Sequence, residues 1–130
     1  PIEYSTSEVA VKRDMSLVRH LVLAIEASPS GFAPRDLAVD GYTHEEIGYH
    51  LHIMLEAGLI RGADVTVHGA KSPEAIATSL TWAGHEFADA ARNEELWAKT
   101  MELTKEKAGS VTIDLIMKVL ASLASSALGL

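Results

Sequence analysis

The sequence predicts an α+β fold that is predominantly helical, and three observations support this. A strongly capped helix at Thr43–Ala57 ends in a glycine. Two short segments with strand-like patterns, Ala63–His68 and Ala75–Leu80, come next and flank a turn-rich loop. From Thr81 onward the periodicity is helical. A helix that runs into a hairpin indicates a winged-helix-like domain, here followed by a C-terminal helical extension.

The chain has 130 residues, which suits one domain or one domain with an appendage. We expect an N-terminal arm over residues 1–11, a winged-helix-like domain over 12–80 and a three-helix extension over 81–130. The composition of residues 1–11 is compatible with either an added strand or a loose arm.

The first helix is expected to begin after Asp14, a favourable N-cap, and to end near Ala27. Its apolar residues repeat at helical spacing and predict one buried stripe, formed by Leu17, Val18, Leu21, Val22 and Ile25. Pro29 and Gly31 break the helix. Beyond them, Arg35–Ala38 could form either a helical turn or a short strand.

The helix at Thr43–Ala57 is the most clearly marked element. Thr43 and Glu46 form a capping box, in which each side chain accepts a hydrogen bond from the other residue's backbone N–H. Gly58 can supply a left-handed helix end, and Leu59 can fold back on the last turn. In the hairpin that follows, Val65 and Val67 are expected to share a half-buried face, and Ile76 supplies an apolar residue to the return strand.

Three helices are expected in the extension, capped by Thr81, Asn93 and Thr112; they span 81–92, 93–107 and 112–128. The break before the last helix is expected at residues 108–110. Trp82, Phe87 and Trp97 are interpreted as core aromatics that join the extension to the hairpin.

Three stretches resemble an uncharacterised bacterial and prophage family, domain of unknown function 2513. They are KRDMSLVRHLVLAIE (Lys12–Glu26), GYTHEEIGYHLHIMLEAGLI (Gly41–Ile60) and LTWAGHEFADAARNEELW (Leu80–Trp97). The resemblance implies a winged-helix-like fold and frequent occurrence near mobile elements. It implies no activity and supplies no functional residues.

Charge argues against a conventional DNA-binding helix. The net charge is −7, and the negative electrostatic field of such a protein repels nucleic acid at long range. The expected outer face of the Thr43–Ala57 helix carries Glu45, Tyr49, His52 and Glu56, with Ile53 at its edge. Carboxylates on that face would lie near phosphates and oppose approach of a duplex.

We therefore expect a regulatory or adaptor protein, for which the fold class permits DNA binding while the local charge does not support it. The candidate DNA contacts are Tyr49, His52, Arg61 and Lys71. DNA binding would be better supported if the nearby basic residues lay on one face of the folded protein. Those residues are Lys12, Arg13, Arg19, Arg61 and Lys71. The alternative is a protein-interaction or oligomerisation module that binds no nucleic acid.

Other chemistry is not indicated. The chain has no cysteine, and it lacks nucleophile-elbow, phosphate-loop and HExxH motifs, so we expect no enzyme, cofactor or metal site. His50 is interpreted as a hydrogen-bonded histidine at the edge of the core. The absence of cysteine and of a signal-peptide pattern at the start of the sequence leads us to expect a cytoplasmic protein.

The last helix is expected to drive homo-oligomerisation. It carries two charged residues, Asp114 and Lys118, and its apolar positions cover roughly 220° of the helix, about twice a surface helix's stripe. The part near Leu115, Val119 and Leu123 would face water unless a second copy covers it. A membrane span is not expected, because the two charges interrupt a stretch barely long enough to cross.

Overall fold

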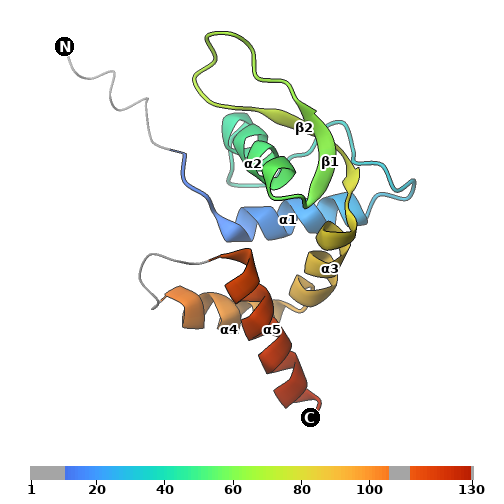
Figure 1. Cartoon of the computed structure of the whole chain (residues 1–130), viewed down its shortest axis with the longest axis vertical. Coiled ribbons are helices and arrows are strands. Elements are labelled where there is room, and N and C mark those ends of the chain that lie inside the picture. The colour runs from blue at the N-terminus through green and yellow to red at the C-terminus, as the bar shows by residue number, and fades with distance from the viewer. Residues whose placement is uncertain (1–10, 106–111, 130) are drawn as a thin grey trace, which may run out of the picture.

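The computed structural model describes residues 11–105 and 112–129. These residues form an α+β fold in which helices predominate, as predicted, with an antiparallel two-stranded sheet (Figure 1). The elements in chain order are α1 (Met15–Glu26), α2 (His44–Glu56), β1 (Ile60–Asp64), β2 (Ala75–Leu80), α3 (Trp82–Ala91), α4 (Glu94–Lys105) and α5 (Ile113–Ala127).

The helices pack on both sides of α1, which lies at the centre of the core. α1 contacts α2, β2 and α3, while α2 also packs on both strands. α5 packs against α4 and α3. Leu17, Leu21 and Val22 of α1 have no exposed surface. Their removal from water stabilises the fold by roughly 1.5–3 kcal/mol per side chain.

The predicted helix caps are confirmed. Asp14, Thr43, Thr81 and Thr112 each accept a hydrogen bond from a backbone N–H of the first turn. Both halves of the Thr43 capping box are present. Asn93 Oδ1 likewise accepts from the Leu96 N–H at 3.0 Å. Local polar side chains therefore set where these helices begin.

The end of α2 carries the chain directly into the hairpin. Gly58 has a φ of 77°, the left-handed conformation in which glycine avoids a steric cost. The Leu59 N–H donates to the Met54 carbonyl at 3.0 Å, and the Gly58 N–H donates to the Leu55 carbonyl at 3.2 Å. These two bonds make a Schellman motif, which buries Leu59 beneath the last turn.

The first strand lies earlier than predicted. It covers Ile60–Asp64, not Ala63–His68, and Val67 is 69% exposed. The Asp64 carboxylate accepts hydrogen bonds from the N–H and the hydroxyl of Thr66, which turn the backbone out of the strand. Val65 is half-buried as expected, but Val67 is exposed, so the prediction that the two residues share a half-buried face was wrong.

A bulge in β2 links the hairpin to the loop after α1. Arg61 pairs with Ser79 and Gly62 with Ala77, so Thr78 is the extra residue of the bulge. The Thr78 carbonyl accepts the backbone N–H of Ala33 at 2.8 Å. The segment 35–38, for which a helical turn and a strand were both considered, forms neither.

The three aromatic residues expected in the core do not behave alike. Phe87 and Trp97 are buried and meet edge to face, with ring centroids 5.9 Å apart. Trp82 is 78% exposed, so its prediction as a core residue was wrong. It occupies the first position of α3, where the buried face is formed later by Gly84, Phe87, Ala88 and Ala91. Two further predictions concern the arm over residues 1–11, all but the last residue of which lies outside the described residues, and the break at residues 108–110, which lies outside them entirely.

Candidate functional site

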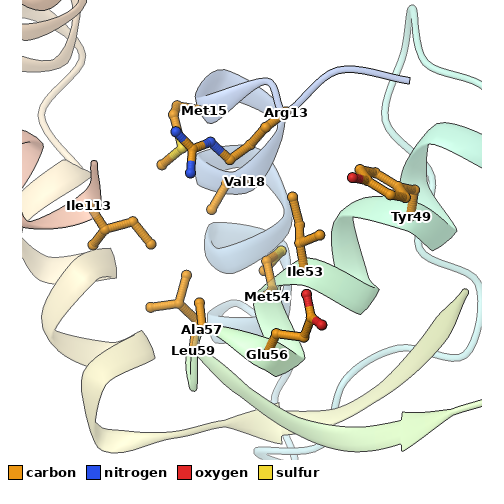
Figure 2. A pocket seen from close by; sticks show the side chains of 10 residues that line it. All are labelled: Arg13, Met15, Val18, Tyr49, Ile53, Met54, Glu56, Ala57, Leu59 and Ile113. Atoms are coloured by element: carbon orange, nitrogen blue, oxygen red, sulfur yellow. The ribbon is translucent and has the colours of Figure 1, made fainter. Parts of the chain in front are cut away.

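The outer side of α2 borders a groove of about 470 Å³ between α1, α2 and the start of α5 (Figure 2). The volume falls within the range of small-ligand and peptide pockets. Most lining residues are apolar: Met15, Val18, Ile53, Met54, Ala57, Leu59 and Ile113. Arg13, Tyr49 and Glu56 complete the lining, with Arg13 and Glu56 toward opposite ends (Figure 2).

The fold determines which parts of this groove are rigid. Met54, Leu59 and Val18 belong to the core and are almost fully buried, so they form a fixed floor. Ile53 is half-buried and Ala57 is exposed, and both lie on the accessible side of α2. Ile113 contributes the first residue of α5. The groove therefore combines segments separated by as many as 100 residues of sequence.

Carboxylates surround the adjacent side of α2. His52 Nε2 lies 3.4 Å from Asp64 Oδ2 on β1, and His52 Nδ1 lies 4.0 Å from Glu56 Oε1. The hydrogen bonds that Asp64 accepts from Thr66 lower its pKa, and nearby His52 lowers it further. Asp64 is thus a stable anion at neutral pH, and this side of α2 presents negative charge.

A hydrogen-bond network beside the groove fixes α1 relative to α2. The backbone N–H of Asp14 donates to His50 Nε2 at 2.8 Å, and Tyr42 donates its hydroxyl proton to Asp14 Oδ2 at 2.7 Å. His50 Nδ1 lies 2.8 Å from the Glu46 carbonyl. Since Nε2 must accept, Nδ1 carries the proton and the ring is neutral in this arrangement. The network ties the start of α1 to the middle of α2.

Sequence reasoning found part of this network. His50 is 1% exposed and hydrogen-bonded at the core, as predicted. Asp14 was identified only as a helix cap, and Tyr42 was missed. No spacing rule connects three residues in separate segments. Ile53, an apolar residue at the edge of the outer face of α2, was the signal available in the sequence for the groove.

The four candidate DNA contacts do not form one patch. Tyr49 lines the groove, while His52 faces Asp64 and Glu56. Arg61 lies at the open end of the hairpin, next to the start of α3, and donates to the Leu80 carbonyl at 2.9 Å. Lys71 lies in the loop at the opposite end of the hairpin.

Arg19 is used by the fold itself. It is 7% exposed, and its guanidinium donates to the carbonyls of Ala91 at 2.7 Å and Arg92 at 3.1 Å. The same group lies over the Trp97 ring, 5.6 Å from the centroid. Arg19 therefore holds the end of α3 and cannot reach a phosphate. The basic residues named from the sequence do not converge on one face.

The three residues proposed for oligomerisation lie along one flank of α5. Leu115, Val119 and Leu123 are half-buried, whereas Ile116 and Leu120 beside them are buried in the core. Over the described ranges, no helix combines the length and apolar character required to cross a bilayer. Within the same residues, no His, Asp or Glu cluster has the geometry of a metal site.

Comparison with known proteins places the chain in a family. The family model described as "Hypothetical protein (DUF2513)" matches residues 12–110. The chain belongs to this family. An uncharacterized protein of Haemophilus influenzae is 32% identical over 121 residues, which cover 91% of this chain and 99% of that protein. No solved structure matches the chain. The DUF2513 match ends before α5, so Ile113 contributes to the groove from outside the matched region.

Proposed function

We propose that this DUF2513 member is a regulatory or adaptor protein that acts by binding another protein through the groove between α1, α2 and α5, without catalysis. The observation that carries the proposal is the character of the outer side of α2. In place of basic residues, this helix presents Ile53 and Tyr49 to an apolar groove, with Glu56 at one end.

A winged-helix-like scaffold is part of this proposal. Its support is the order of α1, α2 and a hairpin, with α2 leading into β1 through a tight glycine turn. A single backbone hydrogen bond, from the Ala33 N–H to the Thr78 carbonyl, ties the loop after α1 to β2. The scaffold lacks a helix between α1 and α2, since residues 28–42 contain turns and bends.

The groove has the composition of a protein-docking surface. Beside the fixed floor, Met15 supplies a polarisable thioether side chain of the kind that adapts to an incoming apolar residue. Tyr49 supplies an aromatic ring of the kind enriched at interfaces. A partner helix or strand could place one or two apolar side chains on the floor formed by Met54 and Leu59.

DNA binding has weaker support. A helix in the major groove needs donors for phosphates and base edges. His52 of α2 has carboxylates on two sides, and Arg61 and Lys71 lie at opposite ends of the hairpin. Asp64 would face the phosphates together with Glu56 and repel them.

Site-specific photo-crosslinking in cells tests the proposal. A photoreactive amino acid replaces Ile53 or Tyr49 in the groove, and a matched control replaces Lys99 on the exposed side of α4. We expect both groove positions to capture the same polypeptide, distinct from the chain itself, and Lys99 not to capture it. The bulky substitution Ala57→Arg should prevent the capture, because Ala57 lines the groove.

Three outcomes would contradict the proposal. They are adducts with nucleic acid alone, adducts of equal yield at Lys99, and no adduct at either groove position. An adduct with a second copy alone would mean that the groove serves assembly and not a separate partner.

A further inference from the structure

One flank of α5 carries an apolar stripe that its own subunit covers incompletely. Leu115, Val119 and Leu123 repeat every fourth residue, so they share one side of the helix. All three are half-buried, whereas Ile116 and Leu120 on the neighbouring side are 0% and 1% exposed. The latter pair docks α5 on its own subunit. The stripe is the edge that this docking leaves in contact with water.

The distribution of charge favours the α5 flank as the place where a second copy of the chain can dock. The protein has a net charge of −7, so two copies repel one another at long range. In α5 the charges of Asp114 and Lys118 cancel, and no charged residue follows from Val119 to Ala127. Ser122 and Ser126 beside the stripe are small and exposed, which permits close helix approach. The α5 flank is therefore a surface on which like-charged copies can meet.

The spacing of the stripe fits a two-fold axis. If two α5 helices run antiparallel with Val119 opposite Val119, Leu115 of each copy lies opposite Leu123 of the other. The same three residues then form both sides of the contact. A parallel pair would instead place each residue opposite its own copy.

The position of α5 in the molecule favours the antiparallel arrangement. Its first half packs against α3 and α4, and residues 121–129 are mostly exposed and extend beyond them (Figure 1). A helix of 15 residues is roughly 22 Å long. Antiparallel pairing places the two acidic bodies at opposite ends of the helix pair, whereas parallel pairing would bring them side by side. We propose that the protein forms a homodimer through an antiparallel α5 pair centred on Val119.

This dimer does not depend on the function proposed for the groove. The stripe lies outside the groove, to which α5 contributes Ile113 alone. If crosslinking at Ile53 fails, the proposed dimer still stands. If the chain proves to be monomeric, the function proposed for the groove still stands.

Single-cysteine crosslinking tests both the dimer and its direction, because the natural chain contains no cysteine. Three full-length variants are prepared: Leu115→Cys, Val119→Cys and Leu123→Cys. Under mild oxidation we expect Val119→Cys to form a disulfide-linked dimer by itself. Leu115→Cys and Leu123→Cys should each stay largely uncrosslinked and should form a mixed dimer when combined. Ser125→Cys, on the exposed side of α5, is the control and should crosslink weakly in every mixture.

Light scattering gives the independent measurement. The wild-type chain should have about twice the 13.9 kDa mass of one copy, and Leu123→Glu should shift it to one copy with unchanged helical circular dichroism. Ser125→Glu should remain dimeric. Self-crosslinking of Leu115→Cys and Leu123→Cys would overturn the antiparallel direction. A wild-type monomer at high concentration, or a dimer unaffected by both Leu123→Glu and Val119→Glu, would overturn the α5 interface.

Discussion

At the residue scale, Asp14 connects three parts of the chain. Its carboxylate caps α1 and accepts a hydrogen bond from the Tyr42 hydroxyl, while its backbone N–H donates a hydrogen bond to His50 of α2. Each contact satisfies a polar group that would otherwise lose its partner on burial, which costs about 1–3 kcal/mol. This one aspartate therefore sets the position of α1 relative to α2.

Tyr42 should make stability depend on alkaline pH. Its hydrogen bond to the Asp14 carboxylate raises its pKa from 10.0 to about 12, because ionisation removes the donor and places two negative charges together. The stabilisation is present in full below pH 10 and is lost as the pH rises toward 12. In urea titrations, the difference in unfolding free energy between wild type and Tyr42→Phe should be constant below pH 10 and shrink above it. A difference that does not change over this window would contradict the assignment.

Replacement of His50 should be costly because the ring bridges α1 and α2. His50→Ala leaves the Asp14 N–H without its acceptor and opens a void, so we expect a loss of about 2–4 kcal/mol in unfolding free energy. The exposed His85 of α3 is a matched control, and His85→Ala should change stability by less than about 0.5 kcal/mol. Chemical denaturation of both variants provides the measurement. Equal effects would mean that the network contributes little.

Sequence reasoning succeeded at this scale where a residue's role was local. His50 lies on the edge of a periodic apolar face, and that pattern was sufficient to predict a hydrogen-bonded core histidine. Trp82 was predicted wrongly, because hydrophobic character does not tell which side of α3 meets the core. Tyr42 was missed, because its partner lies 28 residues away.

At the element scale, the Thr43 cap should contribute measurably to α2. Thr43→Ala removes the hydroxyl that accepts the Glu46 backbone N–H, although the backbone N–H of residue 43 can still donate to the Glu46 carboxylate, and we expect a loss of about 1 kcal/mol. Thr43→Ser keeps the hydroxyl acceptor and is the control, with most of the stability retained. Thermal or urea unfolding distinguishes the two variants. Equal stability of Thr43→Ala and wild type would show that the box does not determine the start of α2.

Gly84 should tolerate no side chain, because α3 crosses the end of α2 at close range. A Cβ at this position would lie 2.1 Å from the Leu59 carbonyl oxygen, which is backbone and cannot rotate away. Alanine would normally stabilise a helix by about 1 kcal/mol over glycine, so the sign of the effect is informative. We expect Gly84→Ala to destabilise by about 1–3 kcal/mol and the exposed Glu86→Ala to be nearly neutral. Stabilisation by Gly84→Ala would contradict the close approach.

The helices could be predicted in detail from the sequence, and the hairpin could not. Helix starts depend on a cap and the residues within one turn of it, as at Thr43 and Thr112. The extent of β1 depends on its pairing with β2 and on the turn made by Asp64 and Thr66, which alternation at Val65 and Val67 does not reveal. The end of α2 before Gly58 was visible because glycine marks a break locally.

At the scale of the whole molecule, the candidate site is a product of tertiary packing. Ile53 and Ile113 are far apart in sequence, and no pattern placed the start of α5 beside α2. Composition did predict one global property, the negative charge. Part of this negative charge lies at α2, where Glu56 and Asp64 of β1 flank His52. This is the side on which a DNA-reading helix would need cations.

The central claim is that α2 binds protein and does not read DNA, and duplex binding across a salt series tests it most directly. With two or three cations available per subunit, we expect weak binding whose log affinity falls against log salt with a slope of about −2 to −3, or about twice that for a dimer. Fluorescence anisotropy of the full chain with random-sequence duplex supplies the measurement. Tight, sequence-specific binding at physiological salt, abolished by Tyr49→Ala or His52→Ala, would contradict the claim.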